Sequence, residues 1–139
     1  MSGKMSLNYS VLLRITLAMV GVHSMLLGAT EYVFTTASYQ FFFSVDPDNF
    51  FYIKQSGVFL FLAVFFYLIP AVDMKRYKLV IAVVVFSKVI AVTFLVSNAH
   101  TTPSPIMIYL AALGDGLMAT AISVLTALCY KNNTSPFDS

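Results

Sequence analysis

Two oppositely charged side chains lie deep inside long apolar stretches of this sequence. Asp115 stands within the run Met107–Tyr130, and Lys88 is the one charged residue of the run Leu79–Asn98. Hydrocarbon does not solvate an ionised group, and a lone charge at the centre of a spanning helix costs about 3 kcal/mol on insertion scales. We therefore expect Lys88 and Asp115 to pair.

The heights of the two residues agree with this pairing. At 1.5 Å per residue, Lys88 lies about 16 Å from the start of its helix and Asp115 about 22 Å from the end of its own, an offset that a lysine side chain covers. Two interpretations stay open. The pair is a proton relay or the polar anchor of a ligand cavity, or it is a structural ion pair that sets the helix register.

His23 is a third candidate for a ligand or proton-relay site. It lies near the middle of the first apolar run, where we expect it to hydrogen-bond across helices to Asp115, Thr16 or Thr120, or to carry protons beside the charged pair. His100, the only other histidine, falls in a loop. Because a bis-histidine haem needs both rings at one iron, and these two lie at different depths, we predict no metal site.

Other kinds of chemistry receive little support. Cys129 is the only cysteine, so neither an internal disulfide nor a CxxC redox pair can form. The sequence contains no phosphate-binding loop, no zinc-protease motif and no Ser–His–Asp grouping in a suitable context. We predict no catalytic residue. The net charge of +2 is too small to indicate a nucleic-acid partner.

The composition places these residues in a membrane. Of the 139 residues, 59% are hydrophobic and 10% are charged, whereas soluble domains carry about 25% charged residues. The length allows one domain, 1–139. We therefore expect an all-α integral membrane protein with the lipid bilayer as its first partner.

Four apolar stretches are long enough to span a bilayer, which takes about 20 helical residues each. We predict a four-helix bundle with helices at about 9–31, 47–70, 77–99 and 106–130. The first stretch is too long for a signal-peptide core and is expected to be retained. Within it, Gly21 and Gly28 share a face, so another helix can approach closely. Asp46 and Pro47 are typical of a helix start, and Pro70 is expected to end the second helix.

The segment between the first two helices is dense in aromatic residues. Because aromatic side chains favour the membrane–water interface, we expect an interfacial loop with a short helix lying flat. Its interface candidates could dock a quinone, a pigment or a partner subunit, or could form an ordinary aromatic belt. They are Tyr39, Phe41, Phe42 and Phe43.

The basic residues indicate the orientation. One face of the predicted bundle carries Lys4, Lys75, Arg76, Lys78 and Lys131, whereas the opposite loops carry Glu31, Asp46 and Asp48 and no lysine beyond Lys54. By the positive-inside rule, both termini are expected in the cytoplasm. We expect a multi-pass protein of a bacterial inner or plasma membrane.

Several of these features resemble the DoxX-like group of small bacterial four-helix membrane proteins. The similar features span about Val11–Leu128: the Leu13–Arg14 opening, a glycine-bearing first helix, a proline-ended second helix, a basic turn, Lys88, and the Gly114–Asp115–Gly116 motif. The resemblance implies a role in quinone-associated oxidation or in membrane stress responses. The phenylalanine-rich outer loop and the absence of a cysteine pair depart from it and put a catalytic role in doubt.

Three functions follow from these observations. The first is a non-catalytic accessory or binding subunit of a larger membrane complex, in contact with other membrane subunits or with copies of itself. The second is a DoxX-like membrane component that binds a quinone, a lipid or another hydrophobic ligand around Lys88 and Asp115. The third is a small proton-coupled transporter. Small multidrug exporters use a carboxylate in the first helix, and Glu31 lies only at the end of that helix.

Overall fold

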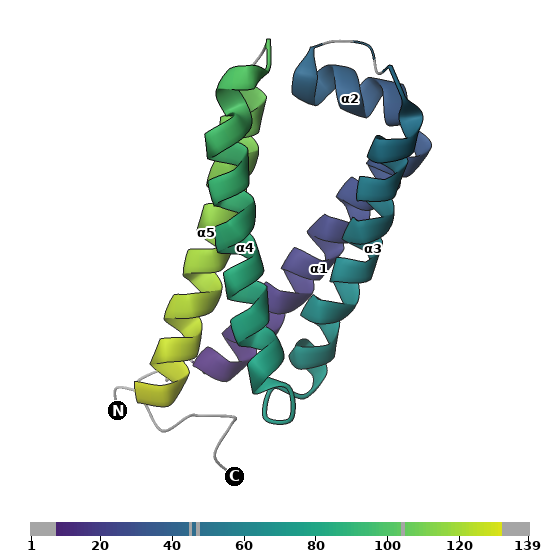
Figure 1. The fold of residues 1–139 in the computed structure, drawn as a ribbon. Helices are drawn as coiled ribbons and strands as arrows, with labels where there is room; N and C mark the ends of the chain where they lie inside the picture. Colours follow the sequence, from purple (N-terminus) through teal and green to yellow (C-terminus); the bar gives the residue numbers. More distant parts are fainter. Residues whose placement is uncertain (1–7, 45, 47, 104, 132–139) are drawn as a thin grey trace, which may run out of the picture.

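The structure is a computed structural model that describes residues 8–44, 46, 48–103 and 105–131. These residues form five α-helices and one short 3-10 turn, Ala99–Thr101, and no strand occurs among them. The helices are α1 (Tyr9–Val33), α2 (Thr35–Phe43), α3 (Phe50–Val72), α4 (Lys78–Asn98) and α5 (Pro105–Lys131) (Figure 1). The all-α prediction is confirmed.

Four of these helices, α1, α3, α4 and α5, are long and apolar enough to cross a membrane. In each, only 17–33% of the most apolar window is buried inside the protein. Many of the remaining apolar side chains are exposed, where lipid can solvate them. The protein is therefore a small multi-pass membrane protein, as expected from its composition.

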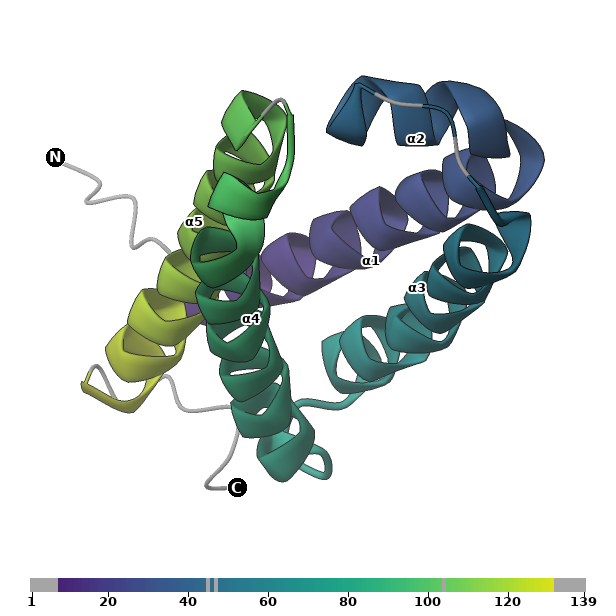
Figure 2. The same ribbon diagram turned by 45° about the horizontal axis from the view of Figure 1, so that its top comes forward.

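The four long helices form two pairs. In both views α1 lies beside α3, and α4 lies beside α5 (Figures 1 and 2). The pairs meet at the end where α1 begins and α5 ends, which we call the base, and they diverge toward the other end. The α2 helix lies across that diverging end, from the α1–α3 pair toward α5. The short crosswise helix predicted between the first two spans is confirmed.

The apolar core lies in the half of the bundle next to the base. Its buried side chains come from all four long helices and the α3–α4 turn: Leu13, Leu17, Val20, Tyr67, Met74, Ile81, Val84, Ile122, Leu125 and Cys129. Toward α2 the buried residues are mostly small or polar, such as Ser24, Gly28, Thr35, Ser38, Ala99 and Ala112. Close packing therefore holds the base together, while the α2 end has little core of its own.

The α1–α3 pair is held at its crossing by two glycines. A Cβ atom on Gly28 would lie 2.8 Å from the carbonyl oxygen of Gly57, and one on Gly57 would lie 2.9 Å from the oxygen of Gly28. A Cβ atom on Gly21 would lie 3.1 Å from the Leu68 side chain. The close approach expected at Gly21 and Gly28 is confirmed, and Gly57 is its partner on α3.

The start of α3 differs from the prediction. The helix begins at Phe50, and Asn49 rather than Asp46 caps it, by accepting a hydrogen bond of 2.8 Å from the backbone N–H of Phe51. Asp46 instead accepts a hydrogen bond of 2.6 Å from the Gln40 side chain. Pro47 lies outside the described residues. Asparagine and aspartate cap helices about equally well, so the pattern alone did not select between them.

The end of α3 also differs. The helix continues through Pro70 to Val72, so the prediction that it stops near the proline was wrong. Proline removes one N–H donor from the helix, and in a membrane helix the local backbone adjusts to this loss. After the proline, the carbonyl oxygen of Ile69 accepts a hydrogen bond from the backbone N–H of Asp73, with 3.3 Å between the oxygen and the nitrogen.

Replacing Gly28 by alanine tests the glycine crossing. The new methyl group would meet backbone atoms of α3, which cannot rotate away, so we expect a loss of about 1–3 kcal/mol in stability. Gly114→Ala is the matched control, because a Cβ atom there meets nothing within 4 Å. Thermal unfolding in detergent measures both variants. Equal midpoints for the two alanine variants would contradict the crossing.

Candidate functional site

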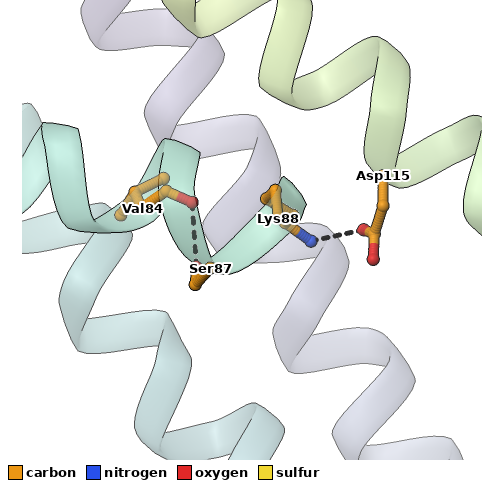
Figure 3. A network of polar contacts seen from close by, with 4 residues as sticks. All are labelled: Val84, Ser87, Lys88 and Asp115. Carbon is orange, nitrogen blue, oxygen red and sulfur yellow. Dashed lines mark hydrogen bonds and ion pairs between the residues drawn. The ribbon is translucent and has the colours of Figure 1, made fainter. Parts of the chain in front are cut away.

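The structure brings Lys88 and Asp115 together as an ion pair between α4 and α5. The Nζ atom of Lys88 lies 2.5 Å from Oδ1 of Asp115, and the side chains are 9% and 19% exposed (Figure 3). The pairing expected from their depths is confirmed. Since both charges are largely withdrawn from solvent, each depends on the other for solvation.

Helical spacing places both residues on the buried faces of their helices. Lys88 follows Ile81 and Val84 on the buried face of α4. On α5, Asp115 lies three residues after Ala112 and four before Ala119, both of which are buried. The pair therefore lies at the edge of the core, where the close packing of the base gives way to the diverging α2 end.

An aromatic ring on α3 completes the surroundings of the lysine. The Lys88 Nζ atom lies 5.6 Å from the centroid of the Tyr67 ring, which is itself buried. A desolvated cation over an aromatic face gains about 2 kcal/mol. Tyr67 thereby connects α3 to the ion pair of α4 and α5. The sequence did not single out Tyr67, because it is one of eight aromatic residues of α3.

A groove of about 340 Å³ lies between α3 and α4, directly beside this site. Its walls are apolar and aromatic and include Phe59, Phe66 and Tyr67 of α3 with Val84 of α4. Ser87 also lines it, and its hydroxyl donates a hydrogen bond of 2.8 Å to the carbonyl of Val84 (Figure 3). The ion pair itself does not line this groove.

The structure does not give His23 the role expected of it. Its side chain is exposed on α1, and within the described part of the chain it makes no hydrogen bond. Thr16 and Thr120, two of its expected partners, donate to carbonyls of their own helices instead. At this depth, the α1 side chain that faces the interior is that of the next residue, Ser24, which is buried.

Ser24 is a buried hydroxyl without a hydrogen-bond partner among the described residues. It lies between Gly21 and Gly28, and all three are buried on α1. The two glycines pack against α3, so the small size of serine suits this face. Loss of a hydrogen bond is the cost of that close packing.

A second polar contact joins α1 and α3 at the end of α1 that leads into α2. The Glu31 carboxylate accepts a hydrogen bond from the Ser56 hydroxyl of α3. Close by, the Nζ atom of Lys54, two residues before Ser56, lies 5.9 Å from the centroid of the ring of Tyr32, the residue after Glu31. These contacts join α1 and α3 near α2. Glu31 therefore helps to hold the α1–α3 pair together.

The predicted interface candidates all lie on α2 and pack partly against each other. The rings of Tyr39 and Phe43 are 4.6 Å apart between centroids, and those of Phe41 and Phe42 are 5.3 Å apart in an edge-to-face arrangement. Phe41 is exposed, and the other three are half-buried. Their role in binding stays a prediction.

No group of three or more histidine, cysteine, aspartate or glutamate side chains that could hold a metal ion occurs in the described ranges. Cys129 is a free thiol buried in the core. Comparison with known proteins gave no match: no family model, no curated protein and no solved structure is significantly similar to this chain.

A double-mutant cycle tests the ion pair. Asp115→Asn leaves the Lys88 ammonium without its counter-charge, and removal of one partner of a buried pair costs about 3–5 kcal/mol in soluble proteins. We expect a lower thermal midpoint in detergent and partial recovery when Lys88→Met is added. Lys75→Met, a change of an exposed lysine in the α3–α4 turn, is the control and should have little effect. Failure of the double variant to recover would show that the two residues are not coupled.

Proposed function

We propose that this protein is a non-catalytic accessory subunit that binds another membrane protein through the outward face of α3. The observation that carries this proposal is the aromatic content of that face. Eight of the 23 residues of α3 are aromatic, and among them only Tyr67 is buried. Two of the 21 residues of α4 are aromatic.

The position of these rings favours a protein partner over a lipid belt. Aromatic belts lie at the two membrane–water interfaces, and Phe50, Phe51 and Tyr52 at the start of α3 fit such a belt. Phe59 and Phe65 are further in, about 13 and 22 Å along the helix from Phe50. Aromatic residues, phenylalanine included, are enriched at protein–protein interfaces.

The ion pair is consistent with a structural role in such a subunit. Lys88 and Asp115 satisfy each other, and the Tyr67 ring covers the ammonium group. The pair thereby joins α4 and α5 to α3 and sets the register of the helices that carry the binding face. His23, the histidine expected to carry protons beside the pair, is instead exposed on α1.

A second function is favoured by the groove between α3 and α4. Its volume of about 340 Å³ and its aromatic walls suit a hydrophobic ligand such as a quinone or a lipid. This is also the function that the DoxX-like resemblance implies. Bound ligand would lie beside Tyr67 and could sense the state of the ion pair through that ring.

We also propose the orientation. The base of the bundle carries Lys75 and Arg76 of the α3–α4 turn and Lys78 at the start of α4, whereas the α2 end carries Glu31 and Asp46 and, as its one lysine among the described residues, Lys54. The positive-inside rule then places the base in the cytoplasm, which suits a bacterial inner membrane.

A fluorescent protein fused after Ser139 should fluoresce in cells, and a periplasmic phosphatase at the same point should be inactive. The reverse result would contradict this orientation.

Site-specific photocrosslinking tests the accessory role. A photoreactive phenylalanine analogue is placed at Phe65 on α3 or, as the matched control, at Phe94 on α4, since these side chains are 61% and 64% exposed. We expect a protein adduct from position 65 and only lipid adducts from position 94. The tagged protein is then purified in mild detergent, and the adduct is identified by mass spectrometry.

The result also separates the alternatives. An adduct with twice the mass of the chain would show that the partner is a second copy. Lipid adducts at both positions would contradict the accessory role. A stoichiometric quinone or lipid that copurifies with the lone protein, and is lost when Ala63→Phe fills the α3–α4 groove, would support the second function instead.

A further inference from the structure

A second groove runs along the outside of the α4–α5 pair in the half of the bundle nearest the base. Its volume is about 460 Å³. Ile81, Val85, Phe86 and Val89 of α4 form its apolar wall. Neither the ion pair nor the aromatic face of α3 contributes to it, so this groove is separate from both surfaces discussed above.

The polar groups of the groove are concentrated at its base end. Lys78, the first residue of α4, and Tyr130, near the end of α5, both line it there. Lys78 is exposed, and no carboxylate in the described part of the chain lies within ion-pair distance of it. The hydroxyls of Ser123 and Thr126 follow on the α5 side. An unneutralised cation thus stands where a membrane headgroup would lie.

The polarity of the groove changes along the membrane normal. From Lys78 to Val89 the helix rises about 16 Å, which exceeds half of the ~30 Å hydrocarbon thickness. The α4 wall is cationic at one end and apolar beyond it, while the hydroxyls of Ser123 and Thr126 on the α5 side donate to carbonyls of their own helix. This order, charge at the interface and hydrocarbon below, is the order of groups in a phospholipid, whose anionic phosphate lies at the surface and whose acyl chains extend inward.

We propose that the α4–α5 groove binds one anionic phospholipid from the leaflet next to the basic turn. Its phosphate pairs with Lys78, and an acyl chain lies along Phe86 and Val89. Basic pockets between membrane helices recognise acidic headgroups in this way. Charge complementarity selects an anionic over a zwitterionic lipid, because Lys78 has no protein counter-charge in the described ranges. This binding is independent of the accessory role and goes beyond it.

Native mass spectrometry of the full chain tests this inference. Dioleoylphosphatidylglycerol or dioleoylphosphatidylcholine is titrated into protein in the same detergent, and bound lipids are counted. We expect one phosphatidylglycerol to bind more tightly than any phosphatidylcholine. One cation near a lipid surface contributes enough for about a fivefold change in affinity, so Lys78→Gln should weaken phosphatidylglycerol binding by about that factor. Glycerol 3-phosphate, the headgroup chemistry without chains, should not compete.

Two matched controls make the test specific. Lys75→Gln removes an equal charge three residues earlier, in the α3–α4 turn, from a side chain that does not line the groove, and should leave the tight site intact. Ala82→Phe fills the groove, whereas Ala127→Phe adds the same ring to an exposed position of α5 outside it; only the first should abolish tight binding. Equal binding of the two lipids, equal losses in Lys78→Gln and Lys75→Gln, or unaltered binding in Ala82→Phe would each overturn the proposal.

Discussion

The ion pair between Lys88 and Asp115 is the interaction on which the arrangement of the helices depends. Inside hydrocarbon neither charge has another source of solvation, so α4 and α5 must stay in the register that joins them. The Tyr67 ring extends this constraint to α3, 5.6 Å from the ammonium nitrogen. Three of the four spanning helices therefore each contribute one side chain to this cluster: Tyr67 from α3, Lys88 from α4 and Asp115 from α5. The fourth, α1, is held to α3 by the close contact of Gly28 and Gly57.

This division explains the shape of the molecule. Below the ion pair, toward the base, large apolar side chains of all four helices form the core. Beyond the pair, the buried residues are mostly small, the two helix pairs diverge, and α2 lies across the end (Figure 1). The buried side chains thus hold the helices together, and the outer surface carries the aromatic face of α3, the α3–α4 groove and the α4–α5 groove.

Much of this arrangement of helices could be predicted from the sequence. Hydropathy defines the spans, and because a helix rises by a constant 1.5 Å per residue, heights alone predicted that Lys88 and Asp115 meet. Rotation about the helix axis could be predicted only where a glycine face or a buried charge marks the inward side, as at Gly21 and Gly28. In lipid nearly every face of a helix is apolar, so no polar side marks the outward direction. That is why His23 was expected inside, and why Tyr67 could not be distinguished from its aromatic neighbours. The partner glycine, Gly57, likewise needed the structure.

The most direct test of the central claim is a distance measured in a lipid bilayer. Solid-state NMR with ¹⁵N at the Lys88 side chain and ¹³C at the Asp115 carboxyl reports their separation by dipolar recoupling, without mutation. An ion pair with N···O within about 4 Å requires a strong coupling between these nuclei, and we expect to observe it. Loss of the coupling in the bilayer, with the protein folded, would mean that the charges are solvated separately, and the pair could not be what holds these helices in register.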